Sequence, residues 1–202
     1  MMKIKGQQNK IYWLNATCLF LAIAFLFCIF LPIIKHFKAE EPSLGLGNYT
    51  GNDIISGGLY DIKKDTIGED NLYVKYEKMT SKAQEYYVTF IAVQQGNLGS
   101  ISALFLLITQ IFAALLAASW LFPVLTQKDT TIICAIISAV TTVLTIVTAF
   151  LFASLTNYTK IEGRPLLSFE VNISWGMILM LVFSILLSIA SFYALAKKVK
   201  RC

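Results

Sequence analysis

Charge is scarce in this sequence of 202 residues, because Asp, Glu, Lys and Arg together make up only 14% of it. Soluble domains usually carry about 25% charged residues. Hydrophobic residues make up 56% of the chain, and its mean hydropathy is +0.66. This balance excludes a soluble enzyme domain, a disordered tail and a nucleic-acid-binding arm. It predicts an integral membrane protein.

Histidine and cysteine are sparse as well. His36 is the single histidine, so the sequence offers no His pair and no Cys-His set for a metal ion. None of the four cysteines, which are Cys18, Cys28, Cys134 and Cys202, lies between residues 35 and 98. A disulfide within that region is therefore excluded, and we expect no metal ion or other cofactor.

Four uncharged stretches are long enough to cross about 30 Å of hydrocarbon as helices, which takes about 20 residues. The predicted membrane-spanning helices cover residues 11–34, 99–126, 131–154 and 171–196. Only helices and closed barrels satisfy the backbone in lipid, and these runs do not alternate as barrel strands would. The first run exceeds the roughly 7–15 residues of a signal-peptide core, so a retained helix is favoured over a cleaved signal. The expected fold class is an all-α membrane protein with a four-helix transmembrane bundle.

The charges outside these runs are unequally divided between two sides. One side, made of residues 1–10, 127–130 and 197–202, carries eight basic residues and one acid. The other side, made of the loops 35–98 and 155–170, carries nine basic residues and eleven acids. Because basic residues stay on the cytoplasmic side, both termini are expected to be cytoplasmic and both larger loops extracellular. The expected location is the plasma membrane.

The first outer loop contains short pieces of β-like composition. Ile54-Ile55 leads into the first piece at residues 57–62, and residues 71–77 alternate apolar or aromatic with polar side chains, as a half-buried strand does. The candidate strand residues of the second piece are Tyr73, Val74 and Tyr76. A polar helix is predicted to begin near residue 82 and to lead into the helix 99–126. We therefore expect a small extracellular β-sheet formed by the first outer loop.

The order of elements and a short motif together resemble a known superfamily. The motif is Gly58-Leu59-Tyr60, and Ala83-Gln84-Glu85 and Ser174-Trp175-Gly176 follow it along the chain. These features are similar to the claudin / peripheral myelin protein / stargazin superfamily, whose first loop carries Gly-Leu-Trp followed by two cysteines. Here Tyr60 stands where the family has Trp, and the cysteine pair is absent.

The resemblance implies a tetraspan protein that acts through its extracellular loops. Its function would be adhesion, a cell junction or membrane organisation, with Gly58, Leu59 and Tyr60 anchoring the outer sheet against the helix ends. The alternative is an auxiliary subunit that modulates an ion channel or receptor. The implied partners are membrane lipids and other membrane proteins or a second copy of the chain, and nucleic acid is not among them.

The four apolar cores contain no Asp, Glu, Lys, Arg or His. Such residues usually mark a proton or ion pathway inside a membrane, so a transport component is a third and less favoured hypothesis. We predict no catalytic residues and no enzymatic activity.

The helix 99–126 carries the candidate packing residues. Gln110 is expected to hydrogen-bond across the bundle, because an unpaired amide is costly in hydrocarbon. A stripe of small residues on this helix consists of Ala113, Ala114, Ala117 and Ala118. Small residues four apart let helices approach closely, so packing within the bundle is favoured over contact with a partner subunit.

Three positions are candidates for covalent modification. Asn48 and Asn157 begin Asn-Tyr-Thr sequences in the two outer loops, which predicts glycosylation and hence a glycoprotein. Cys202 follows a basic cluster beside the last helix, which makes it a candidate for lipidation, although an unmodified end fits equally well.

Overall fold

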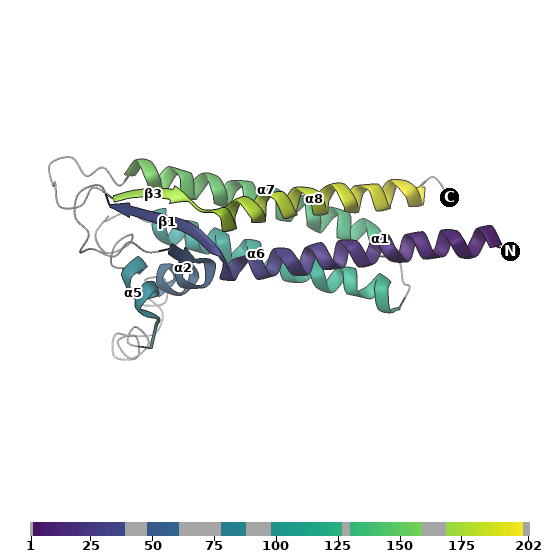
Figure 1. Cartoon of the computed structure of the whole chain (residues 1–202), viewed down its shortest axis with the longest axis horizontal. Helices are drawn as coiled ribbons and strands as arrows, with labels where there is room; N and C mark the ends of the chain where they lie inside the picture. The colour runs from purple at the N-terminus through teal and green to yellow at the C-terminus, as the bar shows by residue number, and fades with distance from the viewer. Residues whose placement is uncertain are drawn as a thin grey trace. The chain divides into compact units, whose positions relative to one another are not determined.

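The computed structural model describes residues 2–38, 48–60, 78–87, 98–126, 130–158 and 169–199 (Figure 1). Its elements are α1 (Met2–Phe27), the 3-10 helix η1 (Cys28–Phe30), β1 (Pro32–Lys38), β2 (Asn48–Thr50), α2 (Gly51–Gly58), α5 (Ser81–Tyr87), α6 (Leu98–Leu125), α7 (Thr131–Tyr158), β3 (Phe169–Ile173) and α8 (Trp175–Val199). The described part of the chain is therefore mainly helical, with short strands between the long helices.

Among the described residues, four helical stretches are long and apolar enough to cross a membrane. They are Tyr12–Phe30, Leu98–Leu125, Thr131–Leu155 and Trp175–Lys198. Each has at least 19 residues, and a helix of about 20 residues spans the hydrocarbon core. The predicted set of four apolar helices is confirmed, and the chain is a multi-pass membrane protein.

The described residues fall into two compact units. The described residues within 1–27, 109–145 and 179–202 form the first unit, which we call the half-bundle. The described residues within 28–108 and 146–178 form the second, which we call the capped unit. The strands and the short helices α2 and α5 all belong to the capped unit.

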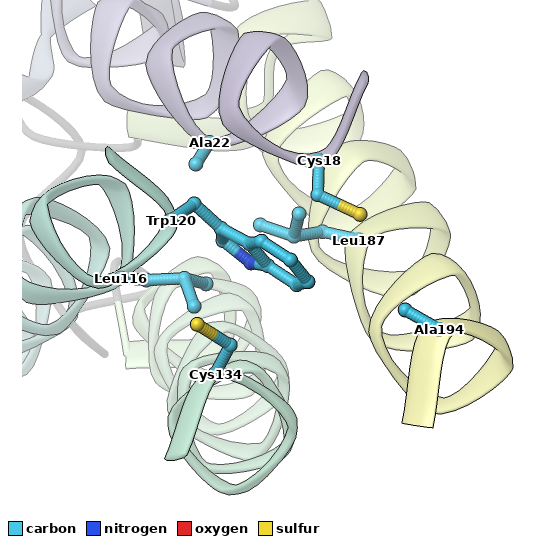
Figure 2. Packing of buried hydrophobic residues seen from close by; sticks show 7 residues of the cluster. All are labelled: Cys18, Ala22, Leu116, Trp120, Cys134, Leu187 and Ala194. Atoms are coloured by element: carbon cyan, nitrogen blue, oxygen red, sulfur yellow. The ribbon is translucent and has the colours of Figure 1, made fainter. Parts of the chain in front are cut away.

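Seven buried residues form the core of the half-bundle, and all four long helices contribute to it. The fully buried Trp120 of α6 lies among the other side chains of this cluster (Figure 2). The cluster consists of Cys18, Ala22, Leu116, Trp120, Cys134, Leu187 and Ala194. Cys18 and Cys134 are free thiols here, so they act as small apolar side chains in this core.

The capped unit contains a three-stranded antiparallel sheet in the order β2-β1-β3. In the central strand β1, Ile34 pairs with Ile173 and Lys38 pairs with Phe169 of β3. The sheet predicted from the first loop alone was therefore wrong in one respect, because its third strand comes from the segment before α8. Phe169–Ile173 alternates apolar with polar residues, which is the period of a strand and the signal that the prediction overlooked.

The first membrane-spanning stretch ends earlier than the predicted range 11–34. Helical structure stops at Phe30, and the strand β1 begins at Pro32. Proline lacks a backbone N–H, and the β-branched Ile33 and Ile34 that follow favour an extended chain. The apolar run 11–34 thus contains a helix and the start of a strand, which hydrophobicity alone cannot separate.

The helix α2 includes Ile54 and Ile55 and extends through Gly57 and Gly58, so the β-structure predicted for residues 57–62 was wrong at its described start. Thr50 caps α2: its Oγ1 accepts a hydrogen bond from Asp53 N at 3.3 Å. The Asp53 carboxylate in turn accepts one from Thr50 N at 3.1 Å. This reciprocal capping box begins a helix and outweighs the strand preference of the two isoleucines. The signal Thr-x-x-Asp was present in the sequence.

Candidate functional site

Two glycines let the pieces of the capped unit approach each other closely. A Cβ atom on Gly176 would collide with the carbonyl oxygen of Pro32 and would lie 2.9 Å from Cβ of Leu31. A Cβ atom on Gly51 would lie 2.8 Å from Cγ1 of Ile29 and 2.9 Å from the Ile29 carbonyl oxygen. The start of α8 therefore lies directly against the start of β1, and the start of α2 lies against η1.

The hydrogen bond from Ser174 N to the Ile33 carbonyl, 2.8 Å long, continues the β1–β3 pairing into the start of α8. Together with the close approach of Gly176, it fixes how the sheet joins that helix. The sheet is thus attached to the membrane-spanning stretches through backbone contacts rather than through a disulfide.

Asp53 links three segments of the capped unit through one carboxylate. Its Oδ2 accepts from Thr50 Oγ1 at 2.6 Å, and its Oδ1 accepts from Thr80 Oγ1 at 3.0 Å. The side chain is only 7% exposed. Thr80 Oγ1 also accepts from Ala83 N at 3.2 Å at the start of α5. The carboxylate therefore joins the end of β2, the start of α2 and the start of α5, across 27 residues of sequence.

Five exposed polar residues of this region form what we call the cap surface. It consists of Asn48, Asn52, Lys78, Ser81 and Lys82. Lys82 Nζ donates to the Asn48 carbonyl oxygen at 3.1 Å, which connects α5 with β2. The helices α2 and α5 also pack against each other. The cap surface is therefore polar, carries two lysines and rests on a tightly connected base.

The family-like motif lies at the end of α2. Gly58 is buried, and Leu59 caps the helix, its N–H donating to the Ile55 carbonyl at 3.1 Å. The Tyr60 ring packs edge-on against Tyr87 of α5, with ring centroids 4.7 Å apart. The motif thus joins two short helices. The candidate strand residues Tyr73, Val74 and Tyr76 lie outside the described residues, as does Cys202.

Gln110 is buried in α6 with 7% exposure. Neither its Oε1 nor its Nε2 has a hydrogen-bond partner, so the expected hydrogen bond across the bundle was wrong. The link between helices comes instead from hydroxyl groups of α7 and α8, which the sequence prediction missed. Thr142 Oγ1 lies 2.8 Å from Ser188 Oγ, and Ser188 Oγ donates to the Ser138 carbonyl at 3.0 Å.

The alanine stripe of α6 divides into two faces. Ala113 is 1% exposed, and Ala117 packs against the Trp120 cluster. Ala114 and Ala118 are exposed. One pair therefore serves packing within the half-bundle, and the other lies on its surface.

The two candidate glycosylation sites differ in backbone setting. Asn48 is exposed at the first position of β2, while Asn157 lies in the last turn of the helix α7.

Among the described residues, no group of three His, Cys, Asp or Glu side chains could hold a metal ion.

No family model, no curated protein and no solved structure matches the chain.

Proposed function

We propose that this chain is a claudin-like multi-pass membrane interaction protein that binds another protein through its cap surface. In this proposal the sheet and the short helices lie outside the cell at the plasma membrane, and the two termini lie in the cytoplasm. The resulting role is adhesion, junction formation or membrane organisation, with no catalytic step.

The observation that carries the proposal is the Asp53 network. An interaction surface works best when its residues are held in place before binding, because ordering them on binding costs affinity. Asp53 receives three hydrogen bonds from Thr50 and Thr80 and so fixes the base of the cap surface. It joins α2 to the start of α5 in a region of the chain whose sequence has no cysteine.

The chemistry of the cap surface also supports a protein partner. Its exposed residues are polar, which suits a surface that is stable in water before it binds. Lys78 and Lys82 give it positive charge, so the proposed partner presents carboxylates at the contact. A glycan at the exposed Asn48 would sit at the border of this surface.

A second candidate function is supported by Ala114 and Ala118. These exposed small residues lie one helical turn apart on α6, where a helix of another protein could approach closely. In that case the chain would be an auxiliary subunit of a channel or receptor, and binding would run along α6 rather than through the cap surface.

Purification of the full chain from native membranes in mild detergent distinguishes the two functions. Recovery of self-oligomers, or of a single-pass or facing-membrane protein, supports the interaction function. Stoichiometric recovery of a larger multi-helix protein supports the auxiliary function. Recovery of the chain as a monomer, also after cross-linking in the intact membrane, contradicts both.

A further inference from the structure

Gln110 carries an amide that is buried in the middle of a membrane-spanning stretch. Its side chain is 7% exposed, and neither Oε1 nor Nε2 forms a hydrogen bond with a described residue. At about 1.5 Å per residue, Gln110 lies about 18 Å from Leu98 and about 22 Å from Leu125 along α6. The four membrane-spanning stretches are described over their whole length, so the unpaired amide is a property of the bundle interior itself.

The helical period places Gln110 and Thr141 on the inner faces of their helices. Seven residues make about two turns of an α-helix, so side chains seven positions apart share a face. Gln110 lies seven residues before Ala117, which packs against the Trp120 cluster, and Thr141 lies seven residues after Cys134 of that cluster (Figure 2). Because the chain reverses between α6 and α7, both steps lead away from the cluster in the same direction. Gln110 and Thr141 therefore face the same interior at about the same height.

The helix α8 adds a hydroxyl group at this height. Thr142 Oγ1, next to Thr141, donates to the Ser184 carbonyl at 2.9 Å. Ser184 lies about one turn before Leu187 of the Trp120 cluster, so its side chain also points inward. Thr141 and Ser184 are each 1% exposed. We call the three inward polar side chains Gln110, Thr141 and Ser184 the polar layer.

The hydrogen-bonding groups of the polar layer complement a small ligand that both donates and accepts. Thr141 Oγ1 donates to the Ile137 carbonyl at 2.8 Å, and Ser184 Oγ donates to the Leu181 carbonyl at 2.9 Å. A hydroxyl has one proton but two lone pairs, so each of these oxygens can still accept. The Gln110 amide offers two N–H donors and one carbonyl acceptor.

The surroundings of the polar layer favour a neutral ligand. The four apolar runs contain no Asp, Glu, Lys, Arg or His, so an ion would meet no opposite charge there. Lipid chains form no hydrogen bonds, and an unsatisfied polar group within the bilayer is costly. Buried water molecules typically make about three hydrogen bonds to polar groups that are otherwise unpaired. Water is the smallest neutral ligand with both donors and acceptors.

We propose that the polar layer binds at least one internal water molecule, which links the Gln110 amide to the hydroxyl groups of Thr141 and Ser184. The water accepts a hydrogen bond from Gln110 Nε2 and donates to the hydroxyl oxygens. The connection of Gln110 across the bundle thus runs through water instead of a direct hydrogen bond. This site does not depend on the cap surface, which belongs to the capped unit.

Nuclear magnetic resonance of the full chain in lipid nanodiscs tests for this water. The glutamine side-chain amides are labelled with nitrogen-15, and the variant Gln110→Leu identifies the Gln110 signal by its loss. Magnetisation transfer from water to the Gln110 amide protons is then measured. We expect a cross-peak with the sign of a long-lived water contact. A visible Gln110 signal without this cross-peak would overturn the proposal.

A double-mutant cycle tests the link itself. The unfolding equilibrium constant in detergent is measured for Gln110→Leu, Thr141→Val and the double variant. If water joins the two side chains, the double variant should differ by at least about twofold from the product of the single effects. Thr17→Val is the matched control, because the Thr17 hydroxyl also donates to a carbonyl of its own helix at 2.8 Å but is exposed. Its effect should multiply with that of Gln110→Leu, whereas independent effects of Gln110→Leu and Thr141→Val would refute the link.

Discussion

The half-bundle and the capped unit are held together by different kinds of contact. The half-bundle relies on apolar packing around Trp120, to which residues of all four long helices contribute. The capped unit relies on directed contacts: backbone pairing in the sheet, two glycine contacts and the Asp53 carboxylate. Packing spreads its energy over many atoms, whereas a directed contact depends on one residue. Single substitutions should therefore damage the capped unit more than the half-bundle.

The largest loss is expected for Gly176→Ala. The added methyl group meets the backbone of Pro32, which cannot move without shifting β1. Overpacking of this kind costs about 1–3 kcal/mol, and a backbone clash places Gly176→Ala near the upper end. The midpoint of thermal unfolding in detergent measures the stability that Gly176→Ala loses. Ile178→Ala, an exposed position two residues away, is the matched control and should change stability by less than about 0.5 kcal/mol.

Asp53→Ala is expected to cost about 2–3 kcal/mol, because it leaves Thr50 and Thr80 without their shared acceptor. Asp53→Asn keeps an acceptor oxygen and should cost less, and Asn52→Ala on the exposed neighbour should be close to neutral. Limited proteolysis of the capped unit and the midpoint of thermal unfolding measure this loss of stability. An Asp53→Ala variant as stable as the unmodified chain would contradict a role for the carboxylate.

The two faces of the alanine stripe give a comparison within one helix. Ala113→Leu should destabilise the half-bundle by about 1–3 kcal/mol, because Ala113 is buried. Ala114→Leu should change the unfolding midpoint little, because that side chain is exposed. If Ala114→Leu also releases a co-purifying multi-helix protein, the auxiliary function gains direct support. Equal effects of the two variants on the midpoint would refute the assignment of faces.

The smallest effect is expected for Thr142→Val, which removes the hydrogen bonds of the Thr142 hydroxyl to α8 and leaves that of Ser188 to the Ser138 carbonyl. Hydrogen bonds between membrane helices contribute about 0.6 kcal/mol on average. Thr17→Val provides the control, because the Thr17 hydroxyl bonds the Trp13 carbonyl within its own helix. A chemical-denaturation series in detergent can resolve the difference. A cost above that of Asp53→Ala would reverse the proposed contrast between the two units.

The sequence predicted the long helices because apolar runs without charge have few alternatives in lipid. It failed where one apolar run changes structure, as at Pro32, and where a polar cap outweighs residue preference, as at Thr50 and Asp53. It also misjudged Gln110, because burial along one helix does not determine whether a partner stands opposite. The Asp53–Thr80 contact spans 27 residues, a distance over which no local pattern signals a pair.

Cross-linking in intact native membranes tests the central claim most directly. The full chain and its Lys78→Glu/Lys82→Glu variant are compared for cross-linked protein partners, and the unfolding midpoint of both is measured. The account predicts a defined cross-linked partner for the unmodified chain and its loss in the variant at an unchanged midpoint. An undiminished product in a variant with both charges reversed would contradict binding through the cap surface.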